Sequence, residues 1–207
     1  GVYDADGADG DDFRTVGGDY YKPTDADYEA NCDEARQLLA DAGYPNGEGF
    51  PVVEYLYNTS DAHKAVAEAL QFMWEEELGV KVTLNNQEWA AFLQTRKDGD
   101  YSIARNGWIA DYNDPISFLD MWMTGGGNND AQYANDDYDA LIKQAKTTTD
   151  NAERMDLLHQ AEDKLIGEDN VLAPLYFYTQ KYMLADGIEG MYYCPLGYFF
   201  FGYTHQA

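Results

Sequence analysis

Basic residues are scarce in this sequence. The 207 residues include 13 lysines and arginines against 38 aspartates and glutamates, giving a formal net charge of −25 at pH 7. A surface this negative repels phosphate backbones, so the composition argues against nucleic acid as a partner. Solubility is the simplest use of such a charge, and a cation-binding surface or a saline habitat is the alternative.

Cysteine and histidine are also sparse. The two cysteines, Cys32 and Cys194, and the three histidines show none of the spacings that are typical of zinc ligands. We therefore expect no metal site and no bound cofactor. Two distant cysteines could form one disulfide in an exported protein, and the sequence leaves that question open.

Catalytic motifs are missing as well. No Gly-x-Ser-x-Gly elbow or phosphate-binding glycine loop occurs, and His63, His159 and His205 are scattered along the chain. A glycosidase would need two carboxylates across a cleft, but any pair is uninformative in so acidic a chain. These absences favour a protein that is not an enzyme, with a hydrolase as the weaker alternative.

Long hydrophobic runs are absent. The longest, Tyr198 to Phe201, has the length of a strand, whereas a membrane helix needs about 20 apolar residues. The chain starts at Gly1 and shows no signal peptide, so we expect it to begin inside a longer gene product or after processing.

The segment at the N-terminus differs from the rest. Residues 1–23 form an acidic lead-in rich in glycine and aspartate, but the spacing after Asp4 does not fit a calcium-binding loop, because Ala8 and Asp9 occupy its fifth and sixth positions. Residues 24–207 carry regular patterns of apolar residues. We expect them to form a single ligand-binding unit.

These patterns predict alternating helices and strands. The expected helices cover residues 24–42, 60–78, 88–97, 115–123, 136–146 and 151–166, and the expected strands cover 51–57, 80–84, 101–107, 172–178, 181–184 and 198–203. This order predicts an α/β layered domain with a mixed sheet, in which ligands bind at strand ends and the loops that follow.

The stretch from Arg105 to Pro115 is the most informative for function. Gly107 permits close approach by another backbone, and Trp108 offers an apolar wall with a polar tip. Asp111 could accept an ammonium group. These features suit an extended zwitterionic peptide, while a buried tryptophan and a turn-forming aspartate are the purely structural alternative.

Several segments, in order along the chain, carry a resemblance to a known family. The matching segments are 34–45, 57–64, 78–82, 86–89, 105–115 and 173–178. The most specific piece is Trp-x-Ala-Asp-Tyr-Asn, which begins at Trp108. Together they resemble the oligopeptide- and dipeptide-binding proteins of ABC importers, a peptide-binding family of extracellular solute-binding proteins.

The resemblance implies a two-lobed fold of the periplasmic-binding-protein type (class II) that closes on its ligand. Residues 24–207 correspond to the C-terminal-side lobe, and the partner lobe is absent from this chain. Members of the family capture short peptides outside the cytoplasm and deliver them to an ABC transporter permease. The resemblance therefore implies a periplasmic protein or a cell-surface lipoprotein, which we expect to be monomeric and without catalysis or a cofactor.

The resemblance also assigns site residues, because the family holds its peptide as an added β-strand. Gly107, Trp108 and Ile109 match the peptide-pairing edge, and Asp111 matches the carboxylate that pairs with the peptide α-ammonium. The remaining matches are the groups available to peptide C-termini of different lengths, Arg96, Arg105 and His63, and a cleft tyrosine, Tyr178.

Other members of this scaffold class bind different solutes, so an oligosaccharide or a metal chelate is the alternative ligand. The 18 tyrosines and 4 tryptophans would suit sugar stacking. Asp111 argues for a peptide, because a neutral sugar offers it no partner. The chain departs from its relatives at Ile109, where a relative can carry cysteine, in its acidity, and in the poorly matching tail after Met183.

Overall fold

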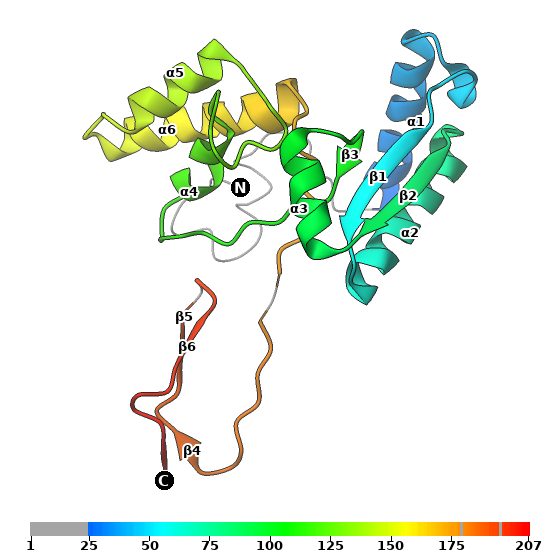
Figure 1. Ribbon diagram of the computed structural model, residues 1–207. Helices are drawn as coiled ribbons and strands as arrows, with labels where there is room; N and C mark the ends of the chain where they lie inside the picture. The colour runs from blue at the N-terminus through cyan, green and yellow to red at the C-terminus, as the bar shows by residue number, and fades with distance from the viewer. Residues whose placement is uncertain (1–24, 179, 195) are drawn as a thin grey trace.

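The computed structural model describes residues 25–178, 180–194 and 196–207. The lead-in expected over residues 1–23 lies outside these ranges. The described chain contains a sheet layer, a helical layer and a C-terminal ribbon that extends away from both (Figure 1).

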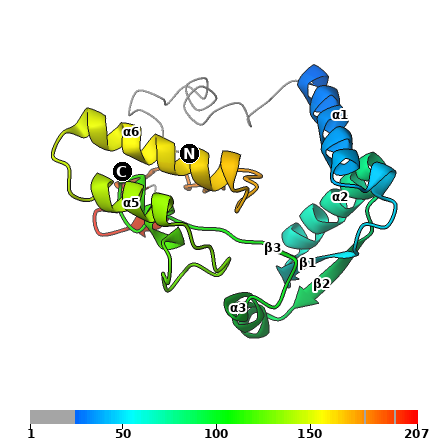
Figure 2. The same ribbon diagram turned by 90° about the horizontal axis from the view of Figure 1, so that it is seen from above.

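The sheet layer contains three parallel strands in the order β2-β1-β3. These strands are β1 (Val53–Asn58), β2 (Val82–Gln87) and β3 (Ile103–Ala104). The connections between them run through α2 (Asp61–Leu78) and α3 (Trp89–Asp98). Figure 2 shows these two helices on opposite faces of the sheet. The order therefore reverses between β1 and β3, which is the arrangement that opens a ligand crevice at the carboxyl ends of the strands.

Alternation along β1 explains how the sheet is packed. Tyr55 and Tyr57 point to one face, where they join a core that includes Ala67 and Trp74 of α2. That core also receives Leu39 from α1 (Asp25–Asp41), which packs on α2.

The helical layer contains α4, α5 and α6. Their bounds, with the short turns that continue them, are α4 (Ile116–Leu119), η4 (Asp120–Trp122), α5 (Asp136–Ala145), α6 (Asn151–Glu162) and the π-helical turn η5 (Asp163–Glu168). The core of this layer is centred on Tyr138, Ile142 and Leu158, which are fully buried. The hydroxyl of Tyr138 donates to the carbonyl of Leu119 at 2.7 Å, so even this buried polar group is satisfied.

Asn129 and Asp130 connect the two layers. The buried Asn129 amide donates to the carbonyls of Met123 and Tyr133 at 3.1 and 2.7 Å, and its oxygen accepts from the Tyr133 N–H at 3.1 Å. The next side chain, Asp130, pairs with Arg96 of α3 at 2.7 Å. Asn129 thus contacts the helical layer, and the next residue, Asp130, contacts the sheet layer.

The C-terminal region contains two antiparallel pairs. β4 (Ile188–Glu189) pairs with β7 (His205–Gln206), and β5 (Tyr192–Cys194) pairs with β6 (Tyr198–Phe200). The prediction of strands over 172–178 and 181–184 is wrong, because these stretches pair with no other strand within the described residues. Leu172 packs against the core of the helical layer, but the other apolar side chains of these stretches are exposed, with Phe177 at 62% and Met183 at 96%.

The α/β class is confirmed, but the sheet differs in detail from the prediction. All three central strands are parallel, and antiparallel pairing is confined to the two separate ribbons. The strand expected over 101–107 is reduced to Ile103–Ala104, because only that part lies beside β1. Cys32 and Cys194 are both free.

Candidate functional site

Several polar side chains lie at the carboxyl ends of β1 and β3. β1 ends at Asn58, α2 begins at Asp61, and the chain leaves β3 through Arg105. The Arg105 N–H donates to the carbonyl of Leu56 at 2.8 Å, which fixes this residue at the edge of the ladder. Charged and polar groups therefore lie at the strand ends, where the strand order leads us to expect a ligand.

The guanidinium of Arg105 is the centre of this cluster. Its Nη1 donates to Oδ1 of Asn58 at 3.1 Å, and its Nη2 donates to the hydroxyl of Tyr178 at 3.0 Å. The ring of Tyr178 lies 5.1 Å from that of Tyr176, centroid to centroid. None of the described carboxylates forms an ion pair with Arg105, so its charge is available to an anionic ligand.

The electrostatics of the neighbouring groups reflect this charge. Burial and the nearby charge of Arg105 both lower the pKa of His63, which therefore favours its neutral form. Burial raises the pKa of the Tyr178 hydroxyl, but hydrogen bonds with Tyr176 and Arg105 outweigh it and leave that pKa below its usual value. The cluster thus favours negative charge, as a site for a carboxylate requires.

Gly107 lies directly against this cluster. A Cβ at this position would be 3.1 Å from Nη2 of Arg105 and 3.6 Å from Cε2 of Tyr178. Past Gly107, no described residue pairs with the backbone N–H or C=O of Trp108 or Ile109. The Ile109 side chain is 63% exposed. This stretch can accept hydrogen bonds from, and donate them to, an added extended chain.

Trp108 and Asp111 are joined through one serine. The hydroxyl oxygen of the buried Ser117 accepts from the backbone N–H of Asp111 at 3.0 Å and from Nε1 of Trp108 at 3.5 Å. Trp108 packs against the core of the helical layer. The Asp111 carboxylate is exposed and has no partner among the described residues. The backbone of Asp111 is therefore held while its carboxylate remains free.

Arg96 is engaged differently from Arg105. Its Nε donates to Oδ2 of Asp130 at 2.7 Å, and its Nη1 donates to Oδ1 of Asn106 at 2.9 Å. The side chains of Arg96 and Asp130 are each 14% exposed. Arg96 thus lies beside the edge, but its charge is already paired.

The structure therefore brings most of the predicted residues together. Arg105, His63, Gly107 and Tyr178 form one cluster, while Trp108 and Asp111 follow along the same segment. Sequence reasoning missed three residues of the site, Asn58, Tyr176 and Ser117. Asn58 could have been predicted from the sequence, because it is a polar residue at the carboxyl end of a buried strand, and parallel sheets bind ligands at those ends.

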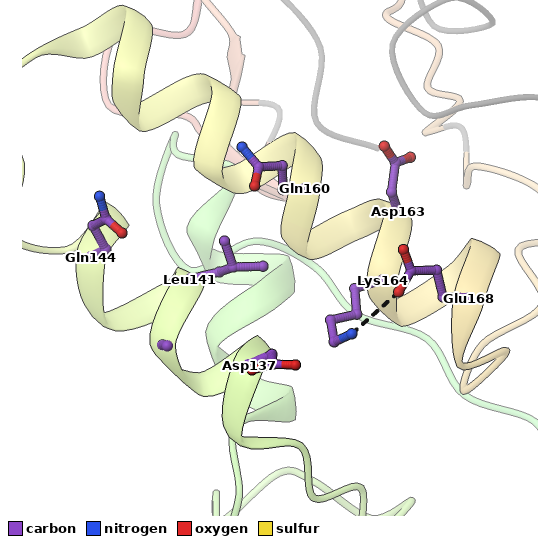
Figure 3. Close-up of a pocket in the computed structure, with 8 residues that line it drawn as sticks. Asp137, Leu141, Gln144, Gln160, Asp163, Lys164 and Glu168 are labelled. Carbon is purple, nitrogen blue, oxygen red and sulfur yellow. Dashed lines mark hydrogen bonds and ion pairs between the residues drawn. The ribbon is translucent and has the colours of Figure 1, made fainter.

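A hollow lies in the helical layer. It measures about 450 Å³, opens between α5 and α6 with its π-helical turn, and is lined by both polar and apolar side chains (Figure 3). An ion pair between Lys164 and Glu168, 3.2 Å apart, lies on its rim. None of the residues that line this hollow comes from the sheet or from the segment around Arg105. In the part of the chain that the structure describes, no three metal-ligating side chains form a cluster.

Comparisons with known proteins place the chain in a family. The model of the bacterial extracellular solute-binding proteins, family 5, middle region, matches residues 2–130. The chain belongs to this family. It is 39% identical to the dipeptide-binding protein DppE of Bacillus subtilis over 92% of the chain, and 39% identical to the periplasmic oligopeptide-binding protein OppA of Salmonella typhimurium over 76% of it. The matches cover 34% and 29% of those two proteins, so this family 5 chain spans about a third of their length.

Solved structures of the family agree with the fold. The substrate-binding domain of an oligopeptide ABC transporter from Bacillus anthracis superposes on 96% of this chain, with a TM-score of 0.73 and 28% identity, and the match covers 38% of that chain. Haemophilus influenzae OppA in complex with the peptide RPPGFSPFR superposes on 65%, with a TM-score of 0.61 and 37% identity, and the match covers 26% of that chain. The predicted periplasmic-binding-protein-like α/β fold is confirmed. Among the described residues, no helix has the length and apolar character needed to cross a membrane.

Proposed function

We propose that residues 24–207 form the C-terminal-side lobe of a two-lobed receptor that captures short peptides, with residues 1–23 as a lead-in. One observation carries this proposal. The backbone of Trp108 and Ile109 is unpaired among the described residues, and it lies between a cationic cluster at Arg105 and a free carboxylate at Asp111. A peptide with free termini has the same order of groups: a carboxylate, an extended backbone and an ammonium.

The order of these groups sets the direction of the bound peptide. The peptide carboxylate would lie near Arg105 and His63, and the ammonium would lie near Asp111, so the peptide would run antiparallel to the segment from 105 to 111. Six residue steps span at most about 20 Å when extended, which is the length of a short peptide. Tyr178 would contribute its hydroxyl, and Arg96 would act from behind the edge.

Pairing through the backbone is indifferent to side chains, so we expect broad selectivity. We propose that the receptor delivers its peptide to an ABC transporter permease and that it works as a monomer outside the cytoplasm, in the periplasm or as a surface lipoprotein. The names of the relatives support this, because they include dipeptide- and periplasmic oligopeptide-binding proteins. We propose that the receptor acts without catalysis and without a cofactor.

A thermal-shift screen of the two-lobed receptor tests the proposal. Mixed di- to pentapeptides should raise the unfolding temperature, because a ligand that binds only the folded state stabilises it. A neutral trisaccharide should leave the unfolding temperature unchanged, since it offers no partner to Asp111. Stabilisation by the sugar alone would refute peptide capture. The appearance of peptide fragments in mass spectra after incubation would instead indicate a hydrolase.

A further inference from the structure

Arg96 lies in the last turn of α3 and contacts residues from two other segments. Its Nε donates to Oδ2 of Asp130 at 2.7 Å, and its Nη1 donates to Oδ1 of Asn106 at 2.9 Å. The guanidinium carbon lies 5.1 Å from the ring centroid of Phe92, which is fully buried. Packing on one side and two polar partners on the other fix the guanidinium in one orientation.

Asp130 is itself held in place. Its backbone carbonyl accepts from the hydroxyl of Tyr101 at 2.9 Å, and the preceding Asn129 is bound to the helical layer. Arg96 and Asp130 are each only 14% exposed. An ion pair so far removed from water presents little net charge to a ligand and would be costly to break.

Asn106 links this ion pair to the peptide-pairing edge. Its Oδ1 accepts from Nη1 of Arg96 at 2.9 Å and also from the backbone N–H of Gly107 at 2.8 Å. One oxygen therefore connects the guanidinium to the first residue of the edge. Because the N–H of Gly107 is occupied in this way, the backbone has a defined orientation where it passes Arg105 and Tyr178.

We propose that Arg96 is a positioning residue, which with Asp130 and Asn106 holds the edge at Gly107 in register for the ligand and does not bind the peptide carboxylate. This inference rests on the proposed function, since it assigns how that same site is held. The carboxylate is left to Arg105, whose charge no described carboxylate neutralises, with His63 beside it.

The test is calorimetry on the two-lobed receptor with tri-, tetra- and pentaalanine, each with a free or an amidated C-terminus. Arg96→Gln should weaken all six peptides by a similar factor of roughly tenfold or more, the effect of losing a hydrogen bond to a charged group. A loss confined to peptides with a free carboxylate would overturn the proposal and make Arg96 a carboxylate ligand.

Two further variants distinguish a positioning residue from a carboxylate ligand by the direction in which peptide affinity changes. Asp130→Asn should also weaken the binding of all the peptides, because the guanidinium of Arg96 loses its ion-pair partner. If Arg96 instead bound the peptide carboxylate, losing that ion pair would leave its affinity for the peptides unchanged or make it higher. Arg96→Lys should not restore affinity, because an ammonium cannot span Asp130 and Asn106 as the planar fork does. If Arg96 bound the peptide carboxylate, a lysine at this position would largely preserve the affinity.

A matched control is Arg36→Gln, which removes an arginine from its ion pair with Glu77 far from the edge and should leave affinity unchanged. Amide hydrogen exchange at Gly107 measures how well its backbone N–H is protected, and this measurement needs no ligand. Its protection should fall in Arg96→Gln and persist in Arg36→Gln, and unaltered protection would overturn the proposal. A wild-type receptor that binds no peptide would refute the proposed function, while Gly107 exchange would still decide the role of Arg96.

Discussion

Asp111→Asn is the substitution with the sharpest expected outcome. The Asp111 carboxylate is exposed and has no partner among the described residues, while its backbone N–H is fixed by the buried Ser117 at 3.0 Å. In the lobe alone, an ammonium beside it would remain in water, where an ion pair contributes at most about 1 kcal/mol. We therefore expect less than about a fivefold loss of affinity there.

In the closed two-lobed receptor the same pair would lose its water. Removing one partner of a desolvated pair costs about 2–5 kcal/mol, so Asp111→Asn should weaken binding by roughly 30-fold or more. The assay is a double cycle read by calorimetry, in which wild type and variant each bind a peptide with a free and an N-acetylated terminus. The two losses should not add, because each removes the same interaction.

A matched control is Asp136→Asn, which removes an exposed carboxylate from the first turn of α5 and should not affect peptide binding. Full additivity of the Asp111 and acetylation effects would mean that the carboxylate and the amine do not meet. The peptide would then not run along Trp108 and Ile109 in the proposed direction.

Three further outcomes follow from the described contacts. Arg105→Gln should raise the pKa of His63 toward its ordinary value, because Arg105 adds to burial in lowering it; an NMR titration in which this pKa stays unchanged would contradict the cluster. Tyr138→Phe should lower the free energy of unfolding in urea by about 1–2 kcal/mol, because the buried Leu119 carbonyl loses its donor, and an unaltered stability would mean that this bond contributes nothing. Gly107→Ala places a methyl group 3.1 Å from Nη2 of Arg105 and should weaken peptide binding, by roughly fivefold, at an unchanged unfolding temperature; unchanged affinity would remove Gly107 from the site.

The sequence predicts those parts of the fold where local signals and packing agree. The valines and tyrosines over 51–57 predict β1, and alternation over 80–84 predicts β2. The boundaries of α2 follow from Ser60 before it and Gly79 after it, which adopts the left-handed conformation with φ of 67°. The tail shows the opposite case. The apolar and aromatic run over 172–178 indicates an extended chain but says nothing of which strand edge it would pair with, and this stretch lies in no ladder among the described residues.

The site was predicted through resemblance more than through spacing. Arg105 and Tyr178 are separated by 73 positions, and no local pattern indicates that they meet at 3.0 Å. The resemblance assigns Arg96 to the groups available to peptide C-termini, because the sequence does not show whether the charge of an arginine is already paired. Among 38 acidic residues, nothing in the sequence singles out Asp130 as its partner.

The neighbouring side chains of Asn129 and Asp130 have a mechanical consequence. The Asn129 amide donates to the carbonyl of Trp122 in η4 at 3.3 Å, and Asp130 pairs with Arg96 of α3, so this loop adds a second connection between the layers besides the segment that leads from β3 to α4. During hinge closure of a two-lobed receptor, both layers would then move as one rigid body. The spacing between Arg105 and Asp111 would be the same before and after closure, so the positions of the two charges would already be set in the open state.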